Sequence, residues 1–407
     1  MGKLTKFNSN NLILIILPIT LVFGNRVVLL KNSLNIPLIA VIILLTTFLG
    51  RIKGQIQIES KRLFLYLLTV SLAILVNIVS SQYSKDFSIF SIAYLSILYF
   101  PVIFVLKKPE NGNLIFTFYQ KSIFIISIIG ILQFLTQLAG IPYRDWLLFY
   151  FPKYIDEFNT SIPLFRGSHL FRSNGLFLVE PSFYSQYLAI AILIDLFYFK
   201  YYRRLPIFIL AILFSFSGTG IVVLVFGLIV KIPKLSLRKL FLPGSLLFVI
   251  LLVFFTTEYG GVLINRLGEF TNENASAYNR FIAPFESFEY WYDEGLKVFL
   301  FGGGAGSVDS FRENIKEDIP VMHPNFFIKS FYEYGLISGF VLFFLITYLF
   351  WGRKSTSGLN LPLFIMFTIV SSGLLNAQQL YFCYTLGMLS VLPKKMTVAT
   401  KSAVSIA

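Results

Sequence analysis

Long apolar runs separated by short polar segments dominate this sequence and most constrain its fold. A membrane-spanning helix needs about 20 mostly apolar residues to cross a hydrocarbon core of about 30 Å, and tilt or local thinning accommodates shorter runs. The candidate spans are residues 11–29, 36–50, 62–80, 88–106, 114–138, 176–199, 205–217, 218–232, 240–256, 325–350, 361–377 and 378–393. The sequence therefore predicts an all-α polytopic membrane protein with about 12 transmembrane helices, in which residues 1–407 form one integral membrane domain.

The composition excludes an ordinary soluble domain. Hydrophobic residues make up 56% of the chain and charged residues only 13%, against about 25% charged residues in soluble proteins. Cys383 is the only cysteine, which excludes an intrachain disulfide framework. Lys3 and Lys6 precede the first apolar run as in a signal peptide, but no small-residue cleavage site follows, so we expect this span to be retained.

The placement of positive charge predicts the orientation of the spans, because Lys and Arg gather on the cytoplasmic side. With a cytoplasmic N-terminus, the cytoplasmic segments contain only two carboxylates, Glu59 and Glu110. Their basic residues are Lys3, Lys6, Arg51, Lys53, Lys61, Arg62, Lys107, Lys108, Lys200, Arg203, Arg204, Lys231, Lys234, Arg238, Lys239, Arg353, Lys354, Lys394, Lys395 and Lys401. Both termini are therefore predicted to be cytoplasmic, with Arg26, Lys31, Lys85 and Lys153 as exceptions to the charge bias.

Two pairs of short spans have a second interpretation. Residues 205–217 and 218–232, and likewise 361–377 and 378–393, are each compatible with one kinked span. If only one of these pairs were a single span, every later segment would change sides of the membrane and the charge bias of those segments would be inverted. We therefore predict separate spans.

Two external segments, residues 139–175 and 257–324, are much longer than the other connections. Loops beyond about 12–15 residues are usually functional or disordered, and these are too rich in aromatic residues for disorder. Within the second loop, residues 275–294 place apolar side chains at helical spacing, which predicts an amphipathic helix. Such a helix would lie on the outer membrane face or simply pack on the spans.

Two ionisable residues mark the junction where the first long loop enters an apolar run. Arg172 precedes this run and Glu180 lies inside it. A charge at mid-membrane costs about 2.5–3.5 kcal/mol on insertion scales, so a carboxylate there is functional by default. Pro181 suits a first helical turn and would place Glu180 at a helix entrance. A pair of interfacial residues reaching toward water is the alternative.

Arg280, His323 and a glycine run at residues 302–307 fall at the same membrane face. The planar arginine guanidinium binds phosphate oxygens through two parallel N–H donors, and two arginines can neutralise a diphosphate. We therefore expect a site that binds a diphosphate leaving group without a metal ion. His323 is a candidate base or donor near neutral pH, with a structural role before the next span as the alternative. The glycine run lacks a P-loop lysine and is more typical of close packing.

Several degenerate motifs occur in the order found in the O-antigen polymerase/ligase superfamily. They are Arg-x-x-Gly-x-Phe-x-x-Glu-Pro-Ser at Arg172–Ser182, the serine-rich turn Ser215–Gly220, Asn279-Arg280, the glycine run within Leu300–Ser307, His323-Pro324-Asn325 and Glu333-Tyr334-Gly335. The ordered set covers roughly residues 166–350. The sequence resembles Wzy-type polysaccharide polymerases of this superfamily, although Pro324 stands where the histidine is usually followed by Asn.

This resemblance implies a GT-C-like glycosyltransferase that needs neither metal nor cofactor. It would polymerise undecaprenyl-diphosphate-linked oligosaccharides, with inversion, at the outer face of a bacterial cytoplasmic membrane. The bilayer and a chain-length regulator would be its partners, and nucleic acid would not. By position, Arg172 and Arg280 would hold the donor diphosphate and His323 would lie beside the reacting groups. Glu180 would take the proton of the attacking hydroxyl.

Three other functions remain open. A ligase would transfer the glycan to another acceptor, but ligases tend to have a neutral residue where this chain has Glu180. A flippase or transporter shares the span count, yet transporters usually have related halves and polar residues near the midplane. A metal-dependent GT-C enzyme would have acidic residues in its first external loop, and residues 25–35 contain none.

Overall fold

The computed structural model describes residues 12–29, 36–83, 87–108, 111–165, 167–229, 245, 256–273, 275–319, 321–352, 358–371 and 373–389. These residues are mostly helical, and their one sheet is a short antiparallel pair that joins β1 (Ile56–Ile58) to β2 (Phe104–Leu106). Lys107 and Lys108 follow β2 directly, so the sheet marks the end of the molecule that the charge pattern predicts to be cytoplasmic.

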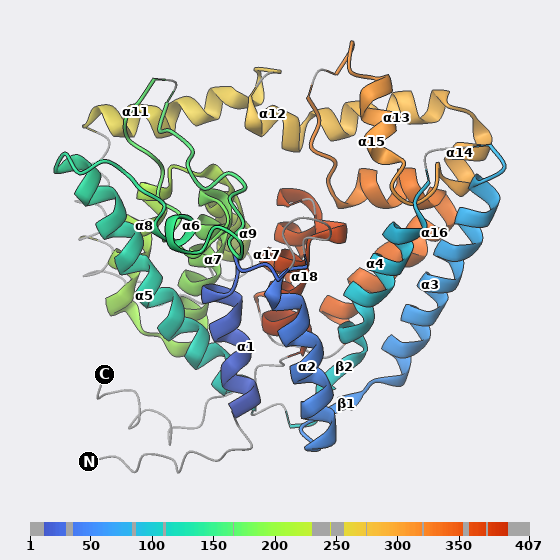
Figure 1. The fold of residues 1–407 in the computed structure, drawn as a ribbon, viewed down its shortest axis with the longest axis horizontal. Helices are drawn as coiled ribbons and strands as arrows, with labels where there is room; N and C mark the ends of the chain where they lie inside the picture. Colours follow the sequence, from blue (N-terminus) through green and yellow to red (C-terminus); the bar gives the residue numbers. More distant parts are fainter. Residues whose placement is uncertain are drawn as a thin grey trace.

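The long helices form three groups (Figure 1). One group, at the left, contains α5 (Gly112–Leu138), α7 (Pro181–Ile194), α8 (Leu205–Ser215) and α9 (Gly218–Ile229). The group at the right contains α3 (Ser60–Ser80), α4 (Ile89–Tyr99) and α16 (Phe326–Trp351). Between them lie α1 (Leu12–Phe23), α2 (Leu38–Ile52), α17 (Asn360–Ile365) and α18 (Ala377–Cys383).

Shorter elements connect and extend these helices. The long loops contain α6 (Trp146–Tyr150), α11 (Glu258–Asn265), α12 (Ser276–Phe281), α13 (Ala283–Asp293), α14 (Leu296–Phe301) and α15 (Val308–Asn314). Single turns are η2 (Phe100–Ile103), η5 (Tyr202–Arg204), η7 (Arg266–Phe270) and η9 (Gly373–Leu375). Three helices continue as π-helices, in η4 (Asp195–Phe199), η8 (Met366–Val370) and η10 (Tyr384–Leu389).

Among the described residues, four helical segments are long and apolar enough to cross a membrane: Ser60–Ser80, Gly112–Leu138, Pro181–Phe199 and Phe326–Trp351. Shorter apolar helices occupy the other predicted spans, except residues 240–256, which lie almost wholly outside the described residues. The described residues are thus mostly helical, as expected of a helical membrane protein, and the count of twelve spans remains a prediction.

Both ambiguous pairs of short spans are separate helices. Phe216 has a left-handed backbone, with φ of 46°, and ends α8 before α9 begins. Asn376 begins α18, since its Oδ1 accepts a hydrogen bond from the Gln379 amide at 3.0 Å. Side-chain capping of this kind satisfies an amide that has no partner inside the helix.

The predicted amphipathic helix at residues 275–294 is two helices, α12 and α13, which cross the top of the molecule in Figure 1. Pro284 lies in the first turn of α13. An amide there has no partner inside the helix, so the missing N–H of proline costs no hydrogen bond. Ala283 and Trp291 are buried against the body, whereas Phe285 and Tyr292 are exposed. One face of this segment thus packs on the spans and the other stays open.

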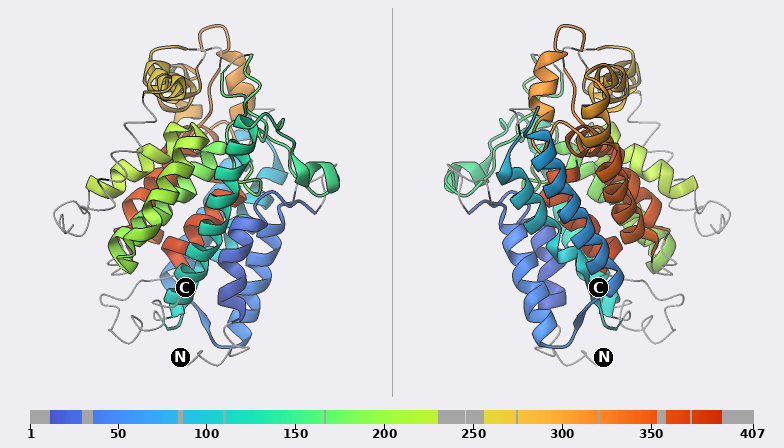
Figure 2. Two further views of the ribbon diagram at one scale, coloured as in Figure 1. Left: turned by 90° about the vertical axis from the view of Figure 1, so that its left-hand side faces the viewer. Right: turned by 90° about the vertical axis from the view of Figure 1, so that its right-hand side faces the viewer.

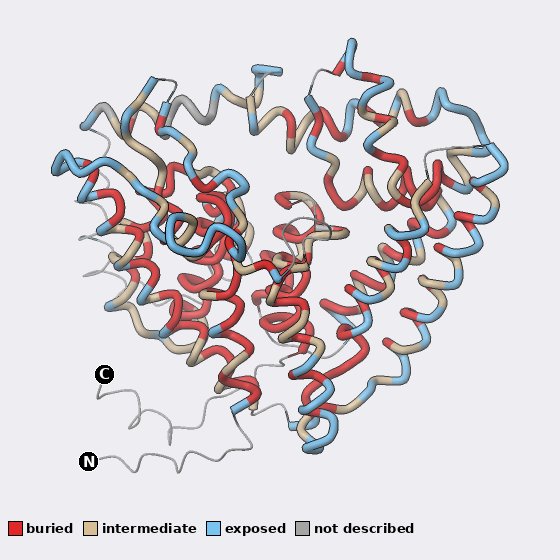
Figure 3. Tube along the Cα trace, in the orientation of Figure 1, coloured by how far each residue is buried: buried red, intermediate tan, exposed pale blue. Residues whose placement is uncertain are grey.

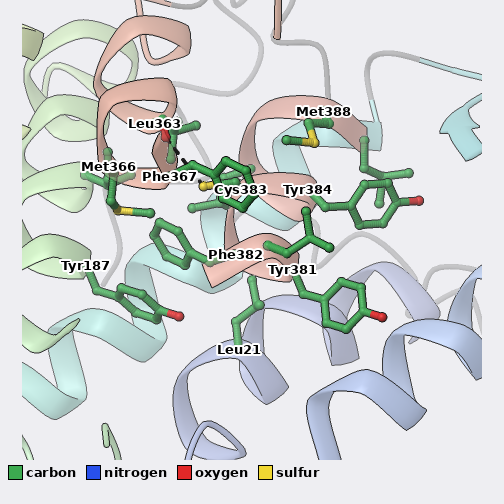
Figure 4. Close-up of a cluster of buried hydrophobic side chains, with 14 of the residues drawn as sticks. Leu21, Tyr187, Leu363, Met366, Phe367, Tyr381, Phe382, Cys383, Tyr384 and Met388 are labelled. Carbon is green, nitrogen blue, oxygen red and sulfur yellow. Dashed lines mark hydrogen bonds between the residues drawn. The ribbon is translucent and has the colours of Figure 1, made fainter. Parts of the chain in front are cut away.

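The core is centred on α7, which is buried along its whole length, and on α18, in which all residues but Gln378 are buried (Figure 3). Tyr187 stacks on Phe382 with ring centroids 3.8 Å apart, inside a cluster that also contains Cys383 (Figure 4). A Cβ on Gly220 would overlap the backbone of Ser185, so the absence of a side chain there lets α9 approach α7. These contacts make α7 a rigid support for the residue at its entrance, Glu180.

Candidate functional site

A cavity of about 550 Å³ lies beside the first residues of α7 and brings together all four site residues predicted from the sequence. Its lining includes Arg172, Glu180, Arg280 and His323. The walls come from the first long loop, the turn between α8 and α9, helix α12, the segment before α16, and the end of η8. Residues more than 150 positions apart in the sequence therefore face one space.

Glu180 is the residue before the first turn of α7, as predicted from Pro181. Its backbone is extended, with φ of −143° and ψ of 161°, and Pro181 is the first residue of the helix. The side chain is only 5% exposed. Its carboxylate accepts hydrogen bonds from Ser182 Oγ and from Asn159 Nδ2, the latter at 3.3 Å. These contacts fix the direction of the carboxylate at the cavity wall.

Arg280 comes from α12 and forms an ion pair with Glu180, with Nη2 3.5 Å from Oε1. Its side chain is 22% exposed. The neighbouring Asn279 is buried, and its carbonyl accepts a hydrogen bond from the His323 amide at 2.9 Å. The Asn279-Arg280 motif thus joins α12 to the segment before α16 while its arginine faces the cavity.

Arg172 lines the cavity from the end of the first long loop. Its backbone amide donates to the Ile162 carbonyl at 2.9 Å, and its Nη2 donates to the Leu164 carbonyl at 3.3 Å. Its Nε is buried and has no hydrogen-bond partner among the described residues. The bond to Leu164 holds the guanidinium on the loop. Because a guanidinium has five N–H donors, Arg172 still keeps donors for a ligand.

His323 and Asn325 have different tasks on either side of Pro324. Asn325 is the N-cap of α16, where its Oδ1 accepts a hydrogen bond from the Ile328 amide at 3.1 Å. His323 exposes its ring to the cavity, but the surrounding protein still makes its protonation unfavourable. Burial, and then the positive charges of Arg280 and Arg312, lower the pKa of His323, against an opposing effect of Glu180. The ring is therefore neutral at pH 7 and able to accept a proton or to donate a hydrogen bond.

Part of the cavity wall is apolar. It includes Phe183, Phe216, Ile221, Val222, Phe270, Phe281, Ile369 and Val370. A lining that combines two arginines with many apolar side chains suits an amphiphile that has an anionic head and a hydrocarbon tail.

The glycine run does not line this cavity; it joins α14 to the outer part of α16. The Gly303 amide donates to the Tyr332 carbonyl at 2.8 Å, and the Gly304 amide donates to the Glu333 carbonyl at 3.0 Å. Gly335 has φ of 69° at a kink in α16, and a Cβ there would overlap the carbonyl oxygen of Leu300. The expectation of close packing at this run is confirmed.

The other arginines of the two long loops lie elsewhere. Arg144 stacks on Phe149, with Cζ 3.5 Å from the ring centroid, and Arg312 pairs with Asp309 at 3.2 Å. Arg166 is outside the described residues, and the side chain of Arg266 is not described. Among the described residues, no three His, Cys, Asp or Glu side chains are grouped to hold a metal ion.

The sequence did not single out Asn159, although it contacts Glu180. Asn159 lies in the middle of the first long loop and has φ of 49°, a left-handed conformation that Asn tolerates better than most residues. An asparagine in an aromatic loop is a weak signal, because only the folded loop places it beside a residue 21 positions later.

The chain was compared with protein-family models, curated proteins and solved structures, and none of the three comparisons found a match.

Proposed function

We propose that this protein is a polysaccharide polymerase of the Wzy type, which joins undecaprenyl-diphosphate-linked oligosaccharides at the outer face of a bacterial cytoplasmic membrane. In this proposal the fold is GT-C-like, with about twelve spans and both termini cytoplasmic. The observation that carries it is the convergence of Glu180, Arg172, Arg280 and His323 on one cavity that also has an apolar wall.

The reaction would be a single inverting displacement. A hydroxyl oxygen of the acceptor sugar attacks the anomeric carbon of the donor, and the bond between that carbon and the diphosphate oxygen breaks. The diphosphate leaves with the bonding electrons, and the attacking hydroxyl loses its proton. Each elongation step thus yields one longer lipid-linked glycan and one free undecaprenyl diphosphate.

The four residues have separate roles in this scheme. Glu180 takes the hydroxyl proton, because its carboxylate is fixed by Ser182 and Asn159 at the cavity wall. Arg172 and Arg280 stabilise the charge that develops on the leaving diphosphate. His323, neutral at pH 7, uses its unprotonated ring nitrogen to accept a hydrogen bond from a reacting hydroxyl. The apolar wall receives the first part of the lipid tail.

The test uses purified protein and one kind of lipid-linked repeat unit. A polymerase needs no second acceptor, so the wild type should produce a ladder of lipid-linked products and Glu180→Gln should not. In a deletion strain, single lipid-linked repeat units should accumulate. Accumulation of full-length lipid-linked polymer would instead identify a ligase, and a changed distribution of the lipid across the membrane, with both pools unchanged, would identify a transporter.

A further inference from the structure

The first long loop contains an aromatic surface that the proposed reaction does not use. We name as the aromatic face the side chains of Trp146, Phe149, Tyr150, Phe151 and Tyr154, all of which are exposed. Every residue of α6 is half-buried or exposed, so packing within the molecule does not explain this composition. Large exposed apolar patches usually mark a surface that another molecule covers.

The depth of the aromatic face in the membrane can be inferred from the length of α2, which lies nearby. α2 has 15 residues and so spans ~22 Å, less than the hydrocarbon core of about 30 Å. Its inner end has the exposed cations Arg51 and Lys53, which the proposed topology places at the cytoplasmic interface. The outer end of α2 would then lie below the outer boundary of the hydrocarbon.

The loop is hydrogen-bonded directly to the turn between α1 and α2, which leads into this low outer end. The Val28 amide donates to the Tyr154 carbonyl at 2.9 Å, and the Asp156 amide donates to the Arg26 carbonyl at 2.8 Å. Irregular backbone at membrane depth is tolerated only when protein satisfies its hydrogen bonds, and the loop supplies them here. In Figures 1 and 2, α6 lies beyond the outer ends of α1 and α2 but lower than the outer end of α5.

The chemistry of the aromatic face fits the boundary between acyl chains and headgroups. Trp and Tyr are enriched at this level of a membrane because their rings are apolar and carry one polar group. Arg144 lies over the Phe149 and Trp146 rings, at 3.5 and 5.2 Å from their centroids, and an arginine can keep its stem in an apolar region while its head reaches water.

We propose that the aromatic face lies in the outer leaflet of the bilayer and contacts lipid acyl chains. This inference rests on the topology given under the proposed function, but not on the reaction. The segment from Asp145 to Tyr154 then completes the outer part of the lipid-facing surface above the short helices α1 and α2. It also keeps the same loop, which contributes Asn159 and Arg172 to the cavity, at a fixed depth.

The experiment uses tryptophan fluorescence, because the chain has only three tryptophans. Trp351→Phe removes one of them and leaves Trp146 beside Trp291, which is 3% exposed and therefore shielded from lipid. The matched control is the double variant with Trp146→Phe and Trp351→Phe, so the difference between the two spectra reports on Trp146 alone. Both variants are measured in nanodiscs, where both membrane faces are accessible to solutes.

Lipids brominated on their acyl chains should quench most of the Trp146 signal, and aqueous iodide should quench little of it. The residual Trp291 signal of the double variant should resist both quenchers. Strong iodide quenching with little effect of bromolipid would overturn the inference. Iodide quenching that is relieved only by an added lipid-linked oligosaccharide would overturn it too, since the aromatic face would then bind sugar. No outcome depends on whether the protein polymerises glycans.

Discussion

Arg26 and Asp145 form a buried bidentate ion pair that fastens the first long loop to the turn between α1 and α2. Nη2 lies 2.6 Å from Oδ2 and Nη1 lies 3.2 Å from Oδ1, and the two side chains are 1% and 7% exposed. Arg26 also donates from Nη1 to the Leu176 carbonyl at 2.6 Å and from Nε to the Asp156 carbonyl at 3.1 Å. This cation, an exception to the predicted charge bias, is therefore a partner of the first long loop and of the segment that follows it.

The first prediction concerns this pair. Asp145→Asn keeps an oxygen that can cap α6 but leaves the Arg26 guanidinium buried without its counter-charge. Removing one partner of a buried pair costs about 3–5 kcal/mol, so we expect a clear fall in the thermal unfolding temperature of the purified protein. The matched control is Asp309→Asn, which breaks an exposed pair with Arg312 and should cost at most about 1 kcal/mol. Equal effects of the two changes would show that the Arg26 pair does not hold the loop.

The second prediction concerns the topology. In a Cys383→Ser background, Glu313→Cys places a thiol on an exposed residue of α15, and Lys53→Cys places one at the exposed inner end of α2. An impermeant maleimide added to intact cells should label the first position and should reach the second only after permeabilisation. Labelling of Lys53→Cys in intact cells would reverse the orientation and move the cavity to the cytoplasmic side.

The third prediction concerns Glu180. Glu180→Gln keeps the shape of the side chain and removes its basicity, so turnover of lipid-linked repeats should fall by about 10²–10⁴-fold. The unfolding temperature should change much less. Ser371→Ala is the matched control, because Ser371 also lines the cavity but has no role in the proposed reaction. Normal turnover by Glu180→Gln would reduce this residue to a structural role and leave His323 as the remaining candidate base.

The fourth prediction concerns the bidentate geometry of the Arg280 guanidinium. Arg280→Lys keeps the positive charge but removes the two parallel N–H donors that match phosphate oxygens. We expect most of the polymerising activity to be lost in a protein that remains folded. Arg312→Lys provides the control, since Arg312 does not line the cavity and pairs with Asp309 at the surface. Polymerisation at the normal rate by Arg280→Lys would rule out a diphosphate clamp at this position.

Much of this architecture could be predicted from the sequence, for identifiable physical reasons. Apolar runs locate helices because a chain in lipid must satisfy its own backbone hydrogen bonds, and this rule placed α3, α5, α7 and α16. Pro181 located the entrance of α7, and with it the position of Glu180. Local chemistry of this kind depends on a few neighbouring residues, which the sequence contains.

Other features depend on contacts between distant segments and could not be predicted. The break at Ile282 divides a segment whose apolar periodicity is continuous. The partnership of Asn159 with Glu180 needs the whole first loop to fold back over α7, and that fold depends on Arg26, 119 residues before Asp145. Periodicity and composition contain no information on such pairings.

The last prediction concerns the pH dependence of the reaction through His323. Burial and the charges of Arg280 and Arg312 lower the pKa of this histidine below its ordinary value of about 6.5, so a step that needs the neutral ring should continue at mildly acidic pH. Arg312→Gln removes one of these positive charges from outside the cavity. The pKa of His323 should then rise, and the acidic limb of the pH–activity profile should move to higher pH.

The control for this shift is Lys316→Gln, which also removes a positive charge from the same loop but is not among the groups that influence His323. Its acidic limb should stay where the wild type has it. Added salt should shrink the shift caused by Arg312→Gln, because Arg312 is partly exposed and its effect is screened. If the acidic limb of Arg312→Gln coincides with that of the wild type at low salt, the protonation of His323 does not limit turnover.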